Sequence, residues 1–227
     1  VKKLIRNIKL GHDVNRSDNA SERWKNMTMV ALGQSKMVKR PIAGFLHIVV
    51  YVGFVIINIE VIEIIIDGLF GTHRVLSFMG GFYDVLIGSF EVLAFLVLIT
   101  VIIFWIRRNV TKLGRFASTD LDGKPRNDAN YILYFEVVLM SLFLIMNAAD
   151  FHLQNLGIGH YNQAGSFPIS QFIAPMFNGM SEGLVVIIER AAWWLHIAGI
   201  LVFLNYLYFS KHLHILLAFP NTFFADL

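Results

Sequence analysis

The residues of this 227-residue sequence that are best suited to hold a redox cofactor are its eight histidines, two of which fall inside long apolar runs. His47 lies in the run Pro41–Ile66, and His196 lies in the run Leu184–Phe209. A polar side chain inside a bilayer is costly, and it therefore usually has a function. Two neutral imidazoles on facing helices are the ligands that a b-type haem needs. The sequence contains no cysteine, which excludes thiolate metal sites and cysteine-ligated iron–sulfur clusters within it.

The spacing of His196 and His214 predicts two stacked sites rather than one. If the last apolar helix continues through His214, their 18-residue spacing is five whole turns. Both side chains would then project from one face, about 27 Å apart. His47 lies near the start of the first run, at the depth expected for His214, and Gly44 and Gly53 beside it would leave room for a macrocycle. We therefore expect one haem between His47 and His214.

The histidine that would complete a second site with His196 is less narrowly defined. His152 directly follows the third apolar run and is the first choice, with His73 and His160 as alternatives. The simpler interpretation of a lone intramembrane histidine is a hydrogen bond between two helices. For the first pair the matching depth favours the haem, whereas for the second pair both interpretations stay open.

Carboxylates and one arginine gather near one end of the apolar runs. A quinone needs a hydrogen-bond partner for each carbonyl and a proton path to one surface, and we assign this role to Glu63 and Arg190. The alternative is that Arg190 pairs with Glu189 or Asp150 while the other carboxylates reach the membrane interface, and for Glu60 that alternative is favoured. The set is Glu60, Glu63, Asp150, Glu189 and Arg190.

Four apolar runs are each long enough to cross a bilayer as a helix. A span needs about 20 apolar residues, and in lipid only a helix satisfies its own backbone hydrogen bonds. Hydrophobic residues make up 56% of the chain, its mean hydropathy is +0.60 and only 15% of its residues are charged, which excludes a disordered chain. The sequence predicts an all-α membrane protein, a bundle of four transmembrane helices. The runs are Pro41–Ile66, Asp84–Ile106, Asn130–Ala149 and Leu184–Phe209.

The segment before the first run is expected to lie along the membrane surface. Arg23–Arg40 mixes apolar residues with lysines, which suits an interfacial helix, and a plain polar tail is the alternative. The expected domains are residues 1–40 as an N-terminal segment, 41–216 as a haem-binding bundle and 217–227 as a tail. Ten Lys and Arg residues precede Pro41 and six lie between the second and third runs, so the positive-inside rule places both termini in the cytoplasm.

A resemblance to a known family is carried by the last apolar run. The residues Trp193–Asn221 read WWLHIAGILVFLNYLYFSKHLHILLAFPN. This segment resembles the last transmembrane helix of the respiratory nitrate reductase gamma-subunit family, which includes the membrane cytochrome b subunit of heterodisulfide reductase. The first run is similar to that family's first haem-ligating helix in its segment FLHIVVYVGF, Phe45–Phe54. The matching positions of the last run are His196, Phe209, Ser210, Lys211, His214 and Pro220.

The resemblance implies an electron-transfer subunit of a quinone-linked oxidoreductase in a respiratory complex of the bacterial inner membrane. Such a cytochrome b exchanges electrons between membrane quinone and a cytoplasmic iron–sulfur partner. By the same resemblance, His47 and His214 would ligate one haem b and His196 would ligate another. The family commonly has a second histidine ten residues after the first, where this sequence has Ile57, so either one haem or two is expected.

A closer resemblance is to the membrane part of fused heterodisulfide reductase-like iron–sulfur proteins. It rests on ALGQSKMVKRPIAGFLH, residues Ala31–His47, and on the ending LLAFPN. In that group a cysteine-rich domain follows the membrane part. The resemblance therefore implies [4Fe–4S] clusters either in a part that follows Leu227 or in a separate partner.

Two other functions stay open at this point. A transporter or proton-conducting subunit would use intramembrane glutamates and histidines, but such proteins usually have broken helices and an internal duplication, and neither is visible in the sequence. A structural membrane anchor would leave the spacing of His196 and His214 unexplained.

Overall fold

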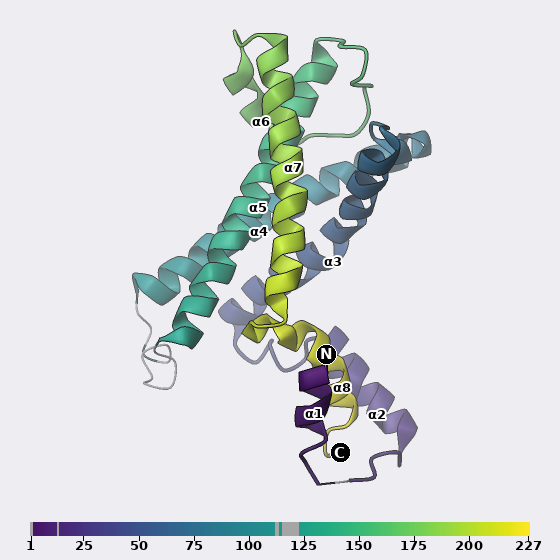
Figure 1. Ribbon diagram of the computed structural model, residues 1–227, viewed down its shortest axis with the longest axis vertical. Helices are drawn as coiled ribbons and strands as arrows, with labels where there is room; N and C mark the ends of the chain where they lie inside the picture. Colours follow the sequence, from purple (N-terminus) through teal and green to yellow (C-terminus); the bar gives the residue numbers. More distant parts are fainter. Residues whose placement is uncertain (1, 13, 112–113, 115–122) are drawn as a thin grey trace. The chain divides into compact units, whose positions relative to one another are not determined.

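The computed structural model describes residues 2–12, 14–111, 114 and 123–227, which form two compact units. One unit contains residues 42–212, and the other contains residues 1–41 together with 213–227. The described residues form eight α-helices and no strand (Figure 1). The prediction of an all-α fold is therefore confirmed, whereas the domain boundaries at residues 40 and 216 stay predictions.

Four long helices make up most of the larger unit. They are 26 to 32 residues long, and each is long and apolar enough to cross a membrane, as the sequence predicted. The first three are longer than the apolar runs that predicted them, because the helices continue beyond the ends of those runs, whereas the last has the same length as its run and lies two residues earlier in the sequence. The helices are α3 (Pro41–Phe70), α4 (Gly81–Asn109), α5 (Lys124–Asn155) and α7 (Glu182–Leu207).

Helix α5 is at the centre of this unit. It packs along α7 and against α4, and Figure 1 shows α5 and α7 running side by side over much of their length. Small residues allow close approach at these contacts: a Cβ atom at Gly199 of α7 would lie 2.7 Å from Cδ2 of Leu139 on α5. The core along α4 and α5 includes the fully buried side chains of Ile87, Phe90 and Phe143.

Gly53 of α3 also marks a close contact between helices. A Cβ atom there would lie only 2.5 Å from Cγ2 of Val97 on α4. The expectation that Gly53 leaves room for a macrocycle is therefore wrong, because the space beside it is filled by Val97.

We expect Gly53→Ala to lower the free energy of unfolding by about 1–3 kcal/mol, because the new methyl group meets a β-branched side chain with little rotational freedom. In a Val97→Ala background the same change should cost little. Gly183→Ala is the matched control, since nothing lies within 4 Å of the added carbon. Thermal unfolding in detergent measures these differences, and equal stability of the Gly53 and Gly183 variants would contradict the packing argument.

The last long helix does not continue to His214. Helix α7 ends at Leu207, residues 208–210 form a turn, a short 3₁₀ helix covers Lys211–Leu213, and α8 (His214–Phe223) begins at His214. The prediction that His196 and His214 share one face of a single helix is therefore wrong.

The physical reason for this break is Asp128, near the start of α5. Its carboxylate accepts hydrogen bonds from the Tyr206 hydroxyl at 2.6 Å, the Ser210 hydroxyl at 3.2 Å and the backbone N–H of Lys211 at 3.1 Å. A carboxylate that takes up hydroxyl and N–H donors in this way stabilises a turn in place of another helical turn.

Asp128→Ala should lower the free energy of unfolding by about 1–3 kcal/mol, because three donors lose their acceptor. The backbone amide of Lys211 should also exchange with solvent deuterium faster than in the unaltered protein. Asn127→Ala, at the exposed neighbouring position, is the control and should change neither quantity. Unaltered exchange at Lys211 in the Asp128 variant would contradict the role of this carboxylate.

The smaller unit joins the two ends of the chain. It contains α1 (Lys2–Ile8), α2 (Ala20–Met27), a π-helical turn (Thr28–Leu32) and α8. The buried Arg23 donates hydrogen bonds to Asp18 and to the carbonyl oxygens of Phe223 and Ala225, and the Trp24 ring meets the Phe223 ring edge-on. The hydrogen bond from Arg23 holds the pKa of Asp18 below its ordinary value. The segment predicted to lie in the membrane interface is thus packed against α8.

Candidate functional site

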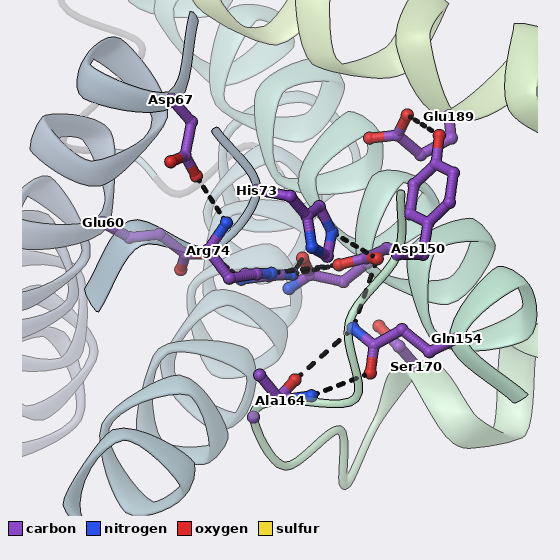
Figure 2. Close-up of polar contacts among 12 residues, drawn as sticks. Glu60, Asp67, His73, Arg74, Asp150, Gln154, Ala164, Ser170 and Glu189 are labelled. Atoms are coloured by element: carbon purple, nitrogen blue, oxygen red, sulfur yellow. Dashed lines mark hydrogen bonds and ion pairs between the residues drawn. The ribbon is translucent and has the colours of Figure 1, made fainter. Parts of the chain in front are cut away.

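A buried polar cluster lies at the end of the larger unit where residues 71–80 join α3 to α4 and residues 156–181 join α5 to α7. We call this the distal end. Arg74 is at the centre of the cluster (Figure 2), with its guanidinium group 2.7 Å from a carboxylate oxygen of Asp150, 2.8 Å from the amide oxygen of Asn147 and 3.2 Å from a carboxylate oxygen of Glu60. One cation therefore connects α3 and α5 through the loop between α3 and α4.

The backbone around Arg74 is arranged to direct its side chain inward. Arg74 has a φ angle of 55°, in the left-handed region that residues other than glycine rarely adopt. The carboxylate of Asp67, in the last turn of α3, accepts hydrogen bonds from the backbone N–H groups of Arg74 at 2.8 Å and Val75 at 3.1 Å. It also accepts a hydrogen bond from the hydroxyl group of Thr72. These three bonds hold the loop against the end of α3 in a conformation that the backbone would otherwise disfavour.

The charge of Arg74 is fixed by its neighbours. Burial by itself would lower the pKa of its guanidinium group, but the carboxylate of Asp150, followed by Tyr83 and Glu60, raises the pKa well above its ordinary value. Arg74 is thus a permanent buried cation, and the carboxylates around it are its counter-ions.

Two further carboxylates complete the cluster. Glu63 accepts hydrogen bonds from the Tyr83 hydroxyl at 2.9 Å and from the backbone N–H of Leu76 at 2.9 Å. Glu189 accepts the Tyr161 hydroxyl at 3.1 Å and pairs with Arg190. The pairing of Arg190 with Glu189 is one of the two, with Glu189 or with Asp150, that the alternative interpretation of the sequence left open. For Tyr161, burial and the adjacent Glu189 raise the pKa of the phenol.

The cluster encloses a small polar cavity of about 30 Å³. Glu63 and Arg190, the two residues predicted from the sequence to bind quinone, both line this cavity, so the structure brings them together. A volume of this size holds one or two water molecules. The lining residues are Glu60, Glu63, Ile64, Asp67, Thr72, His73, Arg74, Met146, Asp150, Glu189, Arg190 and Trp193.

Arg74, the central residue of this cluster, was not among the functional residues predicted from the sequence. The sequence did contain a sign of its role. Arg74 is one of two Lys or Arg residues near the distal end, and four of the carboxylates that line the cavity had been noted there, so an arginine in the short loop was a candidate counter-ion. Glu60 was assigned to the membrane interface, and that assignment is wrong: its side chain is 1% exposed and bonded to Arg74.

A second feature is the buried ring of His196 in α7, which is 1% exposed. Its Nδ1 lies 3.0 Å from the carbonyl oxygen of Leu139 on α5, so Nδ1 carries the proton that this bond needs. Within the described part of the chain, Nε2 is buried and has no hydrogen-bond partner. An imidazole whose Nδ1–H is held by a backbone carbonyl presents an unprotonated Nε2, which is the form that ligates iron.

The structure does not bring His152 close to His196. Leu139, whose carbonyl contacts His196, precedes His152 by 13 residues on α5, which is about 20 Å along the helix axis. The His152 ring lies against Phe177, with ring centres 6.0 Å apart.

The remaining candidate histidines are placed as follows. The Nε2 atom of His73 is 2.9 Å from Asp150, and its ring packs against that of His160 at 5.6 Å. His47 is half-buried in α3, in the larger unit, whereas His214 begins α8, in the smaller unit, so its pairing with His47 stays a prediction. In residues 2–12, 14–111, 114 and 123–227, no group of three or more His, Asp or Glu side chains is arranged to hold a free metal ion.

Comparison with known proteins gives two relatives. The chain is 31% identical over 224 residues to a probable iron–sulfur-binding oxidoreductase, FadF, of Bacillus subtilis, and 24% identical over 220 residues to an EtfAB:quinone oxidoreductase of Syntrophomonas wolfei. These alignments cover 99% and 95% of this chain but only 30% and 29% of the relatives. The chain thus spans less than a third of the length of either relative.

No family model matches the chain, and no solved structure matches it. The similarity to two oxidoreductases supports a relationship to oxidoreductases in general. The finer assignment to the nitrate reductase gamma-subunit family stays an expectation from the sequence.

Proposed function

We propose that this chain is the membrane electron-transfer part of a quinone-linked oxidoreductase and that it binds haem b. The observation that carries the proposal is the buried His196 ring, whose Nδ1–H is engaged by the Leu139 carbonyl and whose Nε2 lies buried without a partner among the described residues. A buried, unsatisfied ring nitrogen is costly unless a ligand completes it. The Phe143 ring, 5.7 Å from the imidazole, adds apolar surface of the kind that surrounds a porphyrin.

The proposed haem ligands are His47, His196 and His214. His196 rests on the geometry just described, and the other two rest on the resemblance of the first and last runs to haem-ligating helices. His152 is left out, because its distance along α5 removes it from the level of His196. A haem b bound by these residues would supply a one-electron carrier inside the membrane.

The proposed electron partner is an iron–sulfur protein or domain on the cytoplasmic side, with its clusters outside this cysteine-free chain. Both relatives are named as oxidoreductases, one as iron–sulfur-binding and the other as acting on quinone. We propose a bacterial inner membrane, as the resemblance implies, with both termini cytoplasmic, since ten Lys and Arg residues precede the first apolar run and six lie between the second and the third. The distal end would then face outward.

The proposed quinone site is the distal cluster. Arg190 is about 40% exposed at its side chain and lies over the Trp193 ring at 5.6 Å, so it can donate to a quinone carbonyl that approaches from the membrane. Glu63 lies on the other side of the same cavity and accepts hydrogen bonds. At its present volume the cavity has room only for water molecules, so a quinone ring would have to displace the Arg190 side chain. Among the side chains in the cluster's ion pairs, that of Arg190 is the most exposed.

The test is reduction of the bound haem by a hydroquinone. In protein reconstituted into lipid nanodiscs, we expect a water-soluble menaquinol analogue to produce the spectrum of reduced haem b, and Arg190→Gln to slow this reduction about tenfold or more. Glu182→Gln, at the exposed start of α7, should leave the rate unaltered. Failure of any hydroquinone to reduce a haem that dithionite reduces would overturn the quinone assignment.

A further inference from the structure

The distal cluster contains more buried negative charge than its cations balance. Four carboxylates are almost completely buried: Glu60, Glu63, Asp150 and Glu189 are 1%, 2%, 3% and 2% exposed. They face two guanidinium groups, those of Arg74 and Arg190, and the latter is only half-buried. Like charges that share a poorly hydrated site cannot all be ionised. At least one of the four carboxyl groups must therefore carry a proton.

Among the described residues, the groups that surround the cluster add more acidic and phenolic groups than cations. Asp67 adds negative charge from α3, Tyr83 and Glu91 approach from α4, and Tyr161 contributes a hydroxyl group from the loop after α5. His73 bonds Asp150 through Nε2. Even a charged His73 would leave the carboxylates in excess, with three positive groups against Asp67 and the four buried acids.

The hydrogen bonds identify which carboxyl group is protonated. Asp150 accepts from Arg74, His73 and Gln154, so both of its oxygens are paired with donors as an ionised group requires. Glu189 accepts from Arg190 and Tyr161 in the same way.

Glu60 differs from both of these acids. Its Oε1 meets Arg74 at 3.2 Å, the longest of that arginine's four side-chain hydrogen bonds, and within the described residues its Oε2 is buried without a partner. Glu63 has donors on both oxygens, from Tyr83 and Leu76, but no cation at hydrogen-bond distance. A proton on Oε2 of Glu60 converts an unsatisfied acceptor into a donor, and the cavity that Glu60 lines has room for the water that would accept its hydrogen bond.

We propose that Glu60 is held as a neutral carboxylic acid whose proton exchanges with water in the distal cavity, and that it is the internal proton donor of the quinone site. The second part rests on the proposed function. A quinone that takes up two electrons from the reduced iron–sulfur partner must also take up two protons to become a hydroquinone. Glu60 supplies one of these protons from Oε2 and regains it from the cavity water, and the distal surface supplies the other.

Infrared spectroscopy tests the proton directly, because a protonated carboxyl group has a C=O stretching band separate from that of a carboxylate. In nanodiscs at neutral pH we expect such a band, and we expect it to shift in D₂O because the proton exchanges. Because Glu91 also has a buried carboxyl oxygen without a partner among the described residues, the signal of Glu60 is the part of the band that depends on residue 60. Glu60→Gln should remove this part of the band, Glu60→Asp should shift it, and Glu63→Gln and Glu182→Gln should retain it. The Asp variant keeps the acid and so serves if the Gln variant does not fold.

A band of unaltered area in Glu60→Gln, a loss of band area only in Glu63→Gln, or the absence of any band at neutral pH would each overturn the proposal. Neither quinone nor haem reduction enters this measurement, so it can fail while hydroquinone still reduces the haem. Conversely, a Glu60 band in a protein that no hydroquinone reduces would support the proton site and overturn the proposed function. Where both hold, Glu60→Gln should lower the rate of quinone reduction about 10²-fold, the typical effect of removing a proton donor, and an unaltered rate would overturn the donor role.

Discussion

Replacing His196 by alanine is expected to remove the haem that His196 binds, so that the haem content of the protein falls by one haem per chain. The reason is that His196 is the imidazole whose tautomer is fixed, with Nδ1 engaged by Leu139 and Nε2 free to ligate iron. Loss of a group that only orients a metal ligand already costs about 10–100-fold in affinity, and loss of the ligand itself costs more. The absorption spectrum of the purified variant, normalised to protein, measures the effect.

Two controls separate this effect from misfolding. His160→Ala changes an exposed histidine of the distal loop and should keep the full haem content. His152→Ala should also keep it, because His152 lies about 20 Å along α5 from the level of His196. Full haem content in the His196 variant would contradict the ligand assignment, and haem loss in the His152 variant would contradict the argument from helix register.

The second large effect is expected at Arg74. Arg74→Leu should lower the free energy of unfolding by about 3–5 kcal/mol, because it leaves Asp150 as a buried carboxylate without its arginine counter-ion and removes the hydrogen-bond donor to Glu60. For a chain of this size the loss corresponds to a drop in Tm of roughly 6–20 °C. Thermal unfolding followed by circular dichroism in detergent measures it.

Arg190→Leu is the matched comparison, since Arg190 is half-exposed and its ion pair is with one adjacent residue. Its cost should be smaller than that of Arg74→Leu, because Arg190 is already partly exposed to solvent and the buried Glu189 keeps the hydrogen bond from Tyr161. The double change Arg74→Leu with Asp150→Leu should cost less than Arg74→Leu alone, because no unpaired Asp150 charge remains. If the Arg74 and Arg190 variants were equally stable, the buried ion-pair network would not be the main support of the distal end.

The four long helices were predictable from the sequence because hydropathy alone decides them. Each apolar run is long enough to cross a bilayer as a helix, and only a helix satisfies its own backbone hydrogen bonds there. The end of the fourth helix was not predictable in this way. The residues after Leu207 remain apolar, and the turn depends on Asp128, which is about eighty positions away in sequence.

The distal site was predictable in composition but not in pairing. Glu63, Glu189 and Arg190 were recognised from their positions near the ends of apolar runs, and they do line one cavity. The role of Arg74 depends on a left-handed backbone residue and on a loop held by Asp67, neither of which leaves a periodic pattern. Glu60 was misplaced for the same reason, because the arginine that donates a hydrogen bond to it comes from that loop.

The depth of a histidine within an apolar run predicts only part of a haem site. Distance from the end of a run places a residue along the membrane normal to within a turn or two, and this was enough to select His196. It was not enough to choose its partner, because His152 and His196 lie on neighbouring helices at different levels. The packing contact between Gly53 and Val97 likewise depends on which helix faces α3, and the sequence of α3 alone carries no such information.

The most direct test of the account is to count haem b in the purified protein by extraction and by the reduced-minus-oxidised spectrum. We predict at least one haem b per chain, and two if a second site forms in addition to the one that includes His196. A protein purified from cells supplied with haem that contains none would contradict the central proposal, and it would leave the buried Nε2 atom of His196 as an unsatisfied group within an anchor or a transporter.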